Sequence, residues 1–215
     1  GLLGLGRRRV VRLPVDGQGR VLADRMPRVE GPTIVCLQAG NINTGAFDPF
    51  EPICTAARAV GAWVHVDGAF GLWAQASPPL APLARGVALA DSWATDAHKW
   101  LNVPYDSGLA FVREPGALPA AMAITAEYLP SPGAERSPSD FTPELSRRAR
   151  GVDVWAVLSS LGKEGVAAMI DGTCVHARRF AEGLGAAGFE ILNEVVLNQV
   201  LVSFGTPEQT HRVIA

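Results

Sequence analysis

Short apolar runs that alternate with helical patterns most strongly constrain the fold of this chain. Four runs that are typical of buried strands lie at 33–39, 62–67, 91–95 and 107–113. A helix is predicted from Asp48, with Pro49 at its first position and Glu51 three residues after the cap, and it ends at Gly61. Near-continuous apolar strands separated by helices indicate a mostly parallel sheet covered by helices on both faces.

The second half of the chain differs from the first in composition and in its predicted elements. Residues 129–143 are rich in Pro, Ser and Gly and are predicted to form an exposed loop. Two helical patterns at 146–162 and 163–188 follow, and then two short strand candidates at 189–194 and 199–205. This order predicts a second, smaller α+β domain after the large one.

Composition and cysteine usage narrow the class of protein. The chain is 48% hydrophobic and 19% charged with a net charge of −2, which indicates a globular protein and gives no electrostatic basis for binding nucleic acid or a membrane. No apolar run approaches the roughly 20 residues that span a bilayer. Three widely spaced cysteines predict reduced thiols in a cytoplasmic protein rather than a disulfide framework or a metal site.

Both ends of the chain fall inside predicted helices. The first eleven residues read as the tail of one helix, and Thr206 and Pro207 read as the N-cap and first position of another. We therefore expect the sequence to be a piece of a longer protein.

Chemically reactive side chains follow two of the predicted strands. Asp67 ends the run 62–67, and Asp96, His98 and Lys99 follow the run 91–95. Ligands of parallel sheets collect at such strand ends. One interpretation is a direct Asp67–Lys99 ion pair, because a buried carboxylate needs a cationic partner. The other places pyridoxal phosphate between them, with a Schiff base to the lysine and the aspartate on the pyridine nitrogen.

Neighbouring residues fit one or the other interpretation. Gly68 and Ala69 are small enough to let a ring approach the backbone beside Asp67, and His98 would serve the phosphate or the imine. His65 and His176 are interpreted as structural. The loop with Asn41, Asn43 and Thr44 is predicted either to form a turn or to contact a cofactor.

Four ordered motifs carry a resemblance to a known family. They are GNINTGAFDP (40–49), HVDGAFG (65–71), TDAHKWLNVPYDSG (95–108) and SRRARGVDVW (146–155). Together they resemble the group II pyridoxal-phosphate-dependent amino-acid decarboxylases, which include glutamate, aromatic-amino-acid and histidine decarboxylases. The resemblance implies an α/β chain with the type I, aspartate-aminotransferase-like fold. Residues 1–145 would be the C-terminal part of the cofactor-binding large domain, and 146–215 the beginning of the small C-terminal domain.

The resemblance also implies roles for individual residues. Lys99 would form the internal aldimine with pyridoxal 5'-phosphate, and Asp67 would hold the pyridine nitrogen. Ala69 would pack on the cofactor face, and His98 would lie beside the phosphate and the aldimine as a catalytic and cofactor-binding residue. Arg147 would bind the substrate carboxylate, although two further arginines follow it closely.

Three departures from the family pattern stand out. The upstream phosphate-binding segment would precede Gly1, and Ile42 stands where many members have threonine. The family's loop tyrosine, which protonates the carbanion left by CO2 loss, has Phe141 as its nearest counterpart before the arginines, with Tyr128 as the other candidate on the loop.

The resemblance therefore predicts decarboxylation of an L-amino acid by a protein that is a cytoplasmic homodimer at full length. The alternatives left open are an aminotransferase or an aldehyde-forming relative, and an inactive partial copy.

Overall fold

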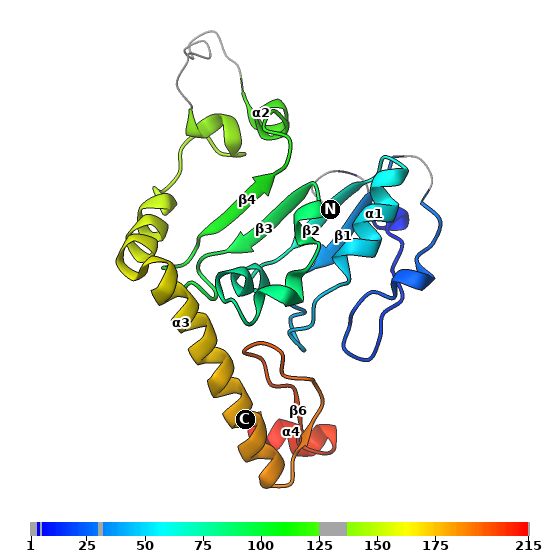
Figure 1. Ribbon diagram of the computed structural model, residues 1–215, viewed down its shortest axis with the longest axis vertical. Helices are drawn as coiled ribbons and strands as arrows, with labels where there is room; N and C mark the ends of the chain where they lie inside the picture. Colours follow the sequence, from blue (N-terminus) through cyan, green and yellow to red (C-terminus); the bar gives the residue numbers. More distant parts are fainter. Residues whose placement is uncertain (1–3, 5, 30–31, 125–136, 215) are drawn as a thin grey trace.

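A computed structural model describes residues 4, 6–29, 32–124 and 137–214, and its centre is a four-stranded sheet (Figure 1). The strands are β1 (Ile34–Gln38), β2 (Trp63–Asp67), β3 (Ser92–Asp96) and β4 (Gly108–Val112), in that order across the sheet. The first three run parallel, and β4 is antiparallel to β3. The predicted mostly parallel sheet is confirmed.

The two faces of the sheet differ. Val35 of β1 and Val64 of β2 are buried, while their neighbours Ile34 and Trp63 are 54% and 37% exposed. Successive side chains of a strand point to opposite faces, so one face of β1 and β2 packs on the core and the other is open. The expected burial of both faces does not hold within the described residues.

Helix α1 (Phe50–Ala59) buries an apolar face against the sheet but lacks the predicted capping box. The Asp48 carboxylate instead accepts hydrogen bonds from the backbone N–H groups of Val21 (2.8 Å) and Gln38 (2.7 Å). Burial raises the pKa of this carboxyl, and the two N–H donors oppose that shift. Asp48 therefore joins the N-terminal segment to β1, and the helix begins two residues later.

Short 3-10 helices fill most connections. They are η1 (Arg7–Arg9), η2 (Ala23–Arg25), η3 (Gly71–Ala76), η4 (Ala81–Ala84), η5 (Val87–Leu89) and η6 (Pro138–Phe141). Instead of the helix tail predicted for the first eleven residues, the described part of that segment holds only the turn η1. Helix α2 (Ala117–Met122) follows β4 and packs against η6.

The long helix α3 (Arg150–Ala186) covers most of the two predicted helices, which join at Gly162, but it begins at Arg150 rather than at residue 146. Gly162 has φ 62° and ψ −177°, which breaks the helical path where the sequence patterns meet. Beyond α3, β5 (Glu190–Ile191) and β6 (Val202–Ser203) form a separate antiparallel pair, followed by α4 (Pro207–Ile214). Thr206 and Gln209 exchange hydrogen bonds at the start of α4, as the predicted N-cap requires. The domain boundary at 145/146 stays a prediction.

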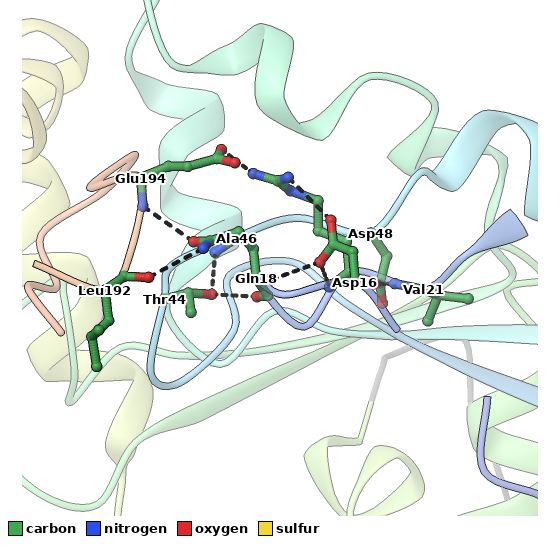
Figure 2. A network of polar contacts seen from close by, with 9 residues as sticks. Asp16, Gln18, Val21, Thr44, Ala46, Asp48, Leu192 and Glu194 are labelled. Carbon is green, nitrogen blue, oxygen red and sulfur yellow. Dashed lines mark hydrogen bonds and ion pairs between the residues drawn. The ribbon is translucent and has the colours of Figure 1, made fainter. Parts of the chain in front are cut away.

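A polar network ties the N-terminal segment to the C-terminal one (Figure 2). Arg20 pairs with both Asp16 and Glu194. The Gln18 carbonyl accepts a hydrogen bond from the Thr44 hydroxyl (2.6 Å), and its side-chain oxygen accepts one from the Glu194 N–H (3.1 Å). Segments nearly 180 residues apart in sequence therefore meet over the loop that follows β1.

Within the described residues, no helix combines the length and the apolar character needed to cross a membrane.

Candidate active site

Two carboxylates stand at the same edge of the sheet. Strands β2 and β3 run parallel, and Asp67 lies opposite Ala94. Because every second residue of a strand points to the same face, the side chains of Asp67, Ala94 and Asp96 share one face of the sheet. Asp67 is exposed, and one of its oxygens accepts a hydrogen bond from the Ala69 N–H (3.1 Å). The predicted meeting of the two strand ends is confirmed.

Lys99 lies in the turn directly after β3. Its Nζ donates to Asp96 Oδ2 at 2.8 Å, and its side chain is 44% exposed. The next two residues, Trp100 and Leu101, are buried, and the Trp100 indole N–H donates to the Thr173 hydroxyl of α3 (2.8 Å). The core thus anchors the turn while the amine stays at its edge. The direct Asp67–Lys99 ion pair is wrong, because Asp96 takes the lysine.

His98 is fixed by the backbone that leads into β4. Its Nδ1 lies 2.8 Å from the Ser107 carbonyl oxygen and 2.9 Å from the Ser107 nitrogen. Its Nε2 lies 3.8 Å from Asp96 Oδ2, and its ring contacts the Tyr105 ring with centroids 4.1 Å apart. The structure places His98 next to Lys99, as predicted. It also brings in Tyr105, which sequence reasoning did not assign to the site. Asp96, which was predicted at this strand end without a role, is the partner of Lys99.

The two small residues after Asp67, Gly68 and Ala69, have different surroundings. Ala69 is partly exposed at the strand edge, and its carbonyl accepts a hydrogen bond from the Asp96 N–H (2.8 Å). A Cβ on Gly68 would stand 2.2 Å from Leu72 Cγ. Leu72 therefore leaves no room for a side chain at position 68, and the role of Gly68 in cofactor access stays a prediction. Ala69 remains available to a cofactor face.

The arginines at the start of α3 divide their contacts. Arg150 binds the Asp106 carboxylate through Nε (3.1 Å) and through a second nitrogen (3.2 Å), and Arg148 reaches the Asp106 carbonyl (3.1 Å). The Arg150 guanidinium, through these hydrogen bonds, lowers the pKa of the Asp106 carboxyl. Arg147 instead pairs with Glu144 at 3.5 Å. The substrate-binding role of Arg147 stays a prediction.

The remaining polar candidates have local partners. Asn41 Oδ1 accepts hydrogen bonds from the N–H groups of Asn43 (3.0 Å) and Thr44 (3.3 Å), which matches the turn interpretation of that loop. His65 Nδ1 lies 2.8 Å from the Ser92 hydroxyl oxygen, and burial lowers the pKa of the imidazole. The structural roles of His65 and of His176, which lies on α3, stay predictions.

The two loop candidates for proton donor have different outcomes. Phe141 ends η6, which packs on α2 beyond the end of β4. Because β4 is antiparallel to β3, its end lies beside the start of β3, at the opposite edge of the sheet from Lys99 (Figure 1). Phe141 is therefore remote from Lys99 of the same chain. Tyr128 lies outside the described residues.

An open cavity of about 530 Å³ adjoins Lys99. Its lining includes Phe70, Asn102, Met169 of α3 and Gln199 of the C-terminal segment. The strand ends, α3 and the segment after β5 therefore border one common space.

Comparisons with known proteins agree with this geometry. The model of the pyridoxal-dependent decarboxylase conserved domain matches residues 19–205. A tyrosine decarboxylase of Papaver somniferum is 31% identical over 184 residues, which are 83% of this chain and 36% of that protein. A phenylacetaldehyde synthase of Petunia hybrida is 32% identical over 155 residues, 70% of this chain and 31% of that protein. The crystal structure of mouse CSAD superimposes with a TM-score of 0.87 at 25% identity, over 99% of this chain and 46% of that one.

The sheet, with an acid and an amine at adjoining strand ends, defines a protein of the type I pyridoxal phosphate class. Within that class, the chain belongs to the pyridoxal-dependent decarboxylase family. The predicted fold and family are confirmed. The chain spans about a third of the length of the curated relatives cited above.

Pyridoxal phosphate fits the residues present. Within the described part of the chain, the Asp67 carboxylate accepts one hydrogen bond and keeps an oxygen for a pyridinium N–H. The Lys99 amine is half exposed and held by a single carboxylate on the same face of the sheet. Asp67 would therefore hold the ring nitrogen, Lys99 the aldehyde carbon and Ala69 one ring face. The described residues contain no cluster of three metal-ligating side chains.

Proposed function

We propose that the protein removes CO2 from an L-amino acid with pyridoxal phosphate as cofactor. The observation that carries this proposal is the placement of Asp67 and the Asp96–Lys99 pair on one face at adjoining strand ends. Membership of the decarboxylase family supports the reaction type.

The chain's own residues divide the work of this reaction. When bound, pyridoxal phosphate supplies a ring that accepts the electron pair left by CO2 loss. Asp67 keeps a proton on the ring nitrogen, and the positive charge of the protonated ring lets it accept those electrons. Asp96 holds the Lys99 amine at the strand edge until the amine is needed for attachment. His98, fixed on Ser107, borders the same edge.

We assign the substrate carboxylate to Arg147. Three residues further on, Arg150 is held on Asp106 in the loop after Lys99, which supports a position for Arg147 near that loop. The relatives named tyrosine decarboxylase and phenylacetaldehyde synthase make aromatic L-amino acids the first substrates to test.

An aldehyde-forming reaction is the second candidate. The similarity to a phenylacetaldehyde synthase favours it, together with a phenylalanine at the position where the family resemblance leads us to expect a phenol. The products separate the two functions, because only the aldehyde-forming reaction consumes O2.

We further propose a homodimer and a reducing, cytoplasmic location. Val152 and Trp155 on the first part of α3 are 60% and 69% exposed, which supports a contact with a second subunit. Cys36, Cys54 and Cys174 are free thiols, which supports a reducing compartment.

Borohydride trapping with a substrate assay tests the main proposal. The chain has two lysines, Lys99 and Lys163, so each serves as the comparison for the other. We expect pyridoxal phosphate followed by borohydride to leave a pyridoxyl tag on Lys99, as read by peptide mass spectrometry, and L-tyrosine to release CO2. A Lys99→Arg variant should lose both signals. A tag on Lys163 alone, or no CO2 from any of the protein L-amino acids, would refute the proposal.

A further inference from the structure

Decarboxylation requires an acid that delivers a proton to the α carbon. When CO2 departs, the electron pair of the broken C–C bond stays behind and must take up a proton. A positioned acid contributes about 10²–10⁴-fold to such a transfer. Phe141 has no proton to give and lies at the far edge of the sheet from Lys99 in the same chain.

Tyr105 brings a phenol to the lysine edge of the sheet. It lies six residues after Lys99, in the loop that leads into β4, and its ring contacts the His98 ring with centroids 4.1 Å apart and planes at 50°. The side chain is 80% exposed, so nothing in the described structure covers the phenol.

Both residues that follow Tyr105 are fixed. Arg150 and Arg148 bind Asp106 from the start of α3, and His98 binds the backbone of Ser107. These contacts hold the loop from two sides, so the Tyr105 ring is presented beside His98 rather than left on an untethered loop.

We propose that Tyr105 is the acid that protonates the α carbon after CO2 loss. The proposal rests on the decarboxylase function proposed above. In this step the Tyr105 O–H bond breaks, its proton forms the new C–H bond with the electron pair left at the α carbon, and a phenolate remains. The phenolate regains a proton from water, to which the exposed side chain is open.

A Tyr105→Phe variant distinguishes the role of the phenol O–H group from that of the aromatic ring. Phenylalanine keeps an aromatic ring against His98 and removes only the O–H group. In the variant loaded with pyridoxal phosphate, we expect amine formation to fall by about 10²-fold or more. O2 then takes the electron pair and is reduced to hydrogen peroxide, while water hydrolyses the C=N bond to aldehyde and ammonia. Tyr128→Phe is the matched control, because these are the chain's two tyrosines, and it should form amine at the original rate.

Nitration of the two tyrosines tests the location of Tyr105 without turnover. Tetranitromethane should nitrate Tyr105 in the cofactor-free protein, because its side chain is exposed. Pyridoxal phosphate with 2-phenylethylamine, an analogue that has no carboxylate to lose and no phenol to nitrate, should slow that nitration at least tenfold relative to Tyr128, as read by peptide mass spectrometry. Equal nitration with and without these ligands would overturn the proposal.

The assay distinguishes failure of this inference from failure of the proposed function. CO2 release by the unaltered protein, with undiminished amine from Tyr105→Phe, overturns the role of Tyr105 alone. If Tyr105→Phe forms amine normally and Tyr128→Phe does not, the proton donor is Tyr128. Absence of CO2 release by the unaltered protein overturns the proposed function and this inference together. Unchanged borohydride tagging of Lys99 in Tyr105→Phe excludes loss of the cofactor as the cause of lost amine.

Discussion

At the scale of single residues, the two carboxylates at the strand edge have different partners and therefore different uses. Asp96 carries the Lys99 amine at 2.8 Å and lies within 3.8 Å of His98. The carboxylate of Asp67, on the neighbouring strand, accepts a hydrogen bond from one backbone N–H within the described residues and has a second oxygen without such a partner. A carboxylate already neutralised by an amine is a poor partner for a pyridinium, which favours Asp67 over Asp96 as the proposed partner of the ring nitrogen.

The Asp67→Asn variant tests that assignment. The change removes the negative charge and keeps the shape, so the ring nitrogen is no longer held protonated. We expect turnover to fall on the order of 10²-fold or more, because charge stabilisation of this kind is lost. Cofactor affinity, measured by equilibrium dialysis, should fall less than turnover. The exposed Asp24 of η2 offers a matched control, and Asp24→Asn should leave both unchanged. A normal rate in Asp67→Asn would exclude its role on the ring nitrogen.

Much of the site could be predicted from the sequence, because residues at the ends of neighbouring parallel strands must meet at one edge. Asp67, His98 and Lys99 were placed together on that basis. The partner of the lysine could not be predicted, because the i, i+3 pairing of Asp96 with Lys99 depends on the geometry of the turn. Tyr105 was missed for a similar reason: no periodic pattern tells which side chain of an irregular loop turns onto His98.

At the scale of elements, the segment after β2 is held by a close approach of backbones. A Cβ on Gly71, the first residue of η3, would stand 2.1 Å from the Ala39 carbonyl oxygen and 2.8 Å from the Gly40 nitrogen. Backbone atoms cannot rotate away as a flexible side chain can. Gly71 therefore sets the distance between η3 and the end of β1, and with it the course of the chain that follows Asp67.

Alanine at Gly71 should cost stability. The added methyl group forces the two segments apart, and overpacking of this kind costs about 1–3 kcal/mol. Urea unfolding followed by circular dichroism measures the loss. Gly151→Ala is the control, because Gly151 lies in the first turn of α3 with nothing within 4 Å of its added Cβ. That change should be neutral or stabilise the protein by up to about 1 kcal/mol. Equal stability of the two variants would refute the close-packing argument.

The strands and the division of α3 could be predicted because their signals are local. Apolar runs marked all four strands, and Gly162 separated the two helical patterns. The antiparallel direction of β4 could not be predicted, because a strand's direction depends on how its connection crosses the sheet. The predicted capping box at Asp48 is wrong because the Asp48 carboxylate accepts hydrogen bonds from the N–H groups of Val21 and Gln38, which lie far from the helix start in sequence.

At the scale of the whole molecule, the two ends of the chain are joined across the loop that follows β1 (Figure 2). Asn193 is buried and donates to the carbonyl oxygens of Thr44 and Gln199, both at 3.0 Å, while it accepts from the Leu201 N–H at 2.8 Å. Nearby, Glu194 pairs with Arg20 at the surface. No sequence pattern predicts contacts over such separations, since each partner has an ordinary local environment in the sequence.

The buried amide and the surface ion pair should differ in their contribution to stability. Asn193→Ala leaves the Thr44 carbonyl and the Leu201 N–H without their side-chain partner in the interior, which costs about 1–3 kcal/mol in the free energy of unfolding. Glu194→Gln removes an exposed ion pair, whose contribution is about 0–1 kcal/mol. Urea unfolding measures both, and hydrogen exchange should show faster exchange of the Leu201 amide in Asn193→Ala alone. If Glu194→Gln is the more damaging change, or if Leu201 exchange is unaltered in Asn193→Ala, the surface pair rather than the buried amide holds the two ends together.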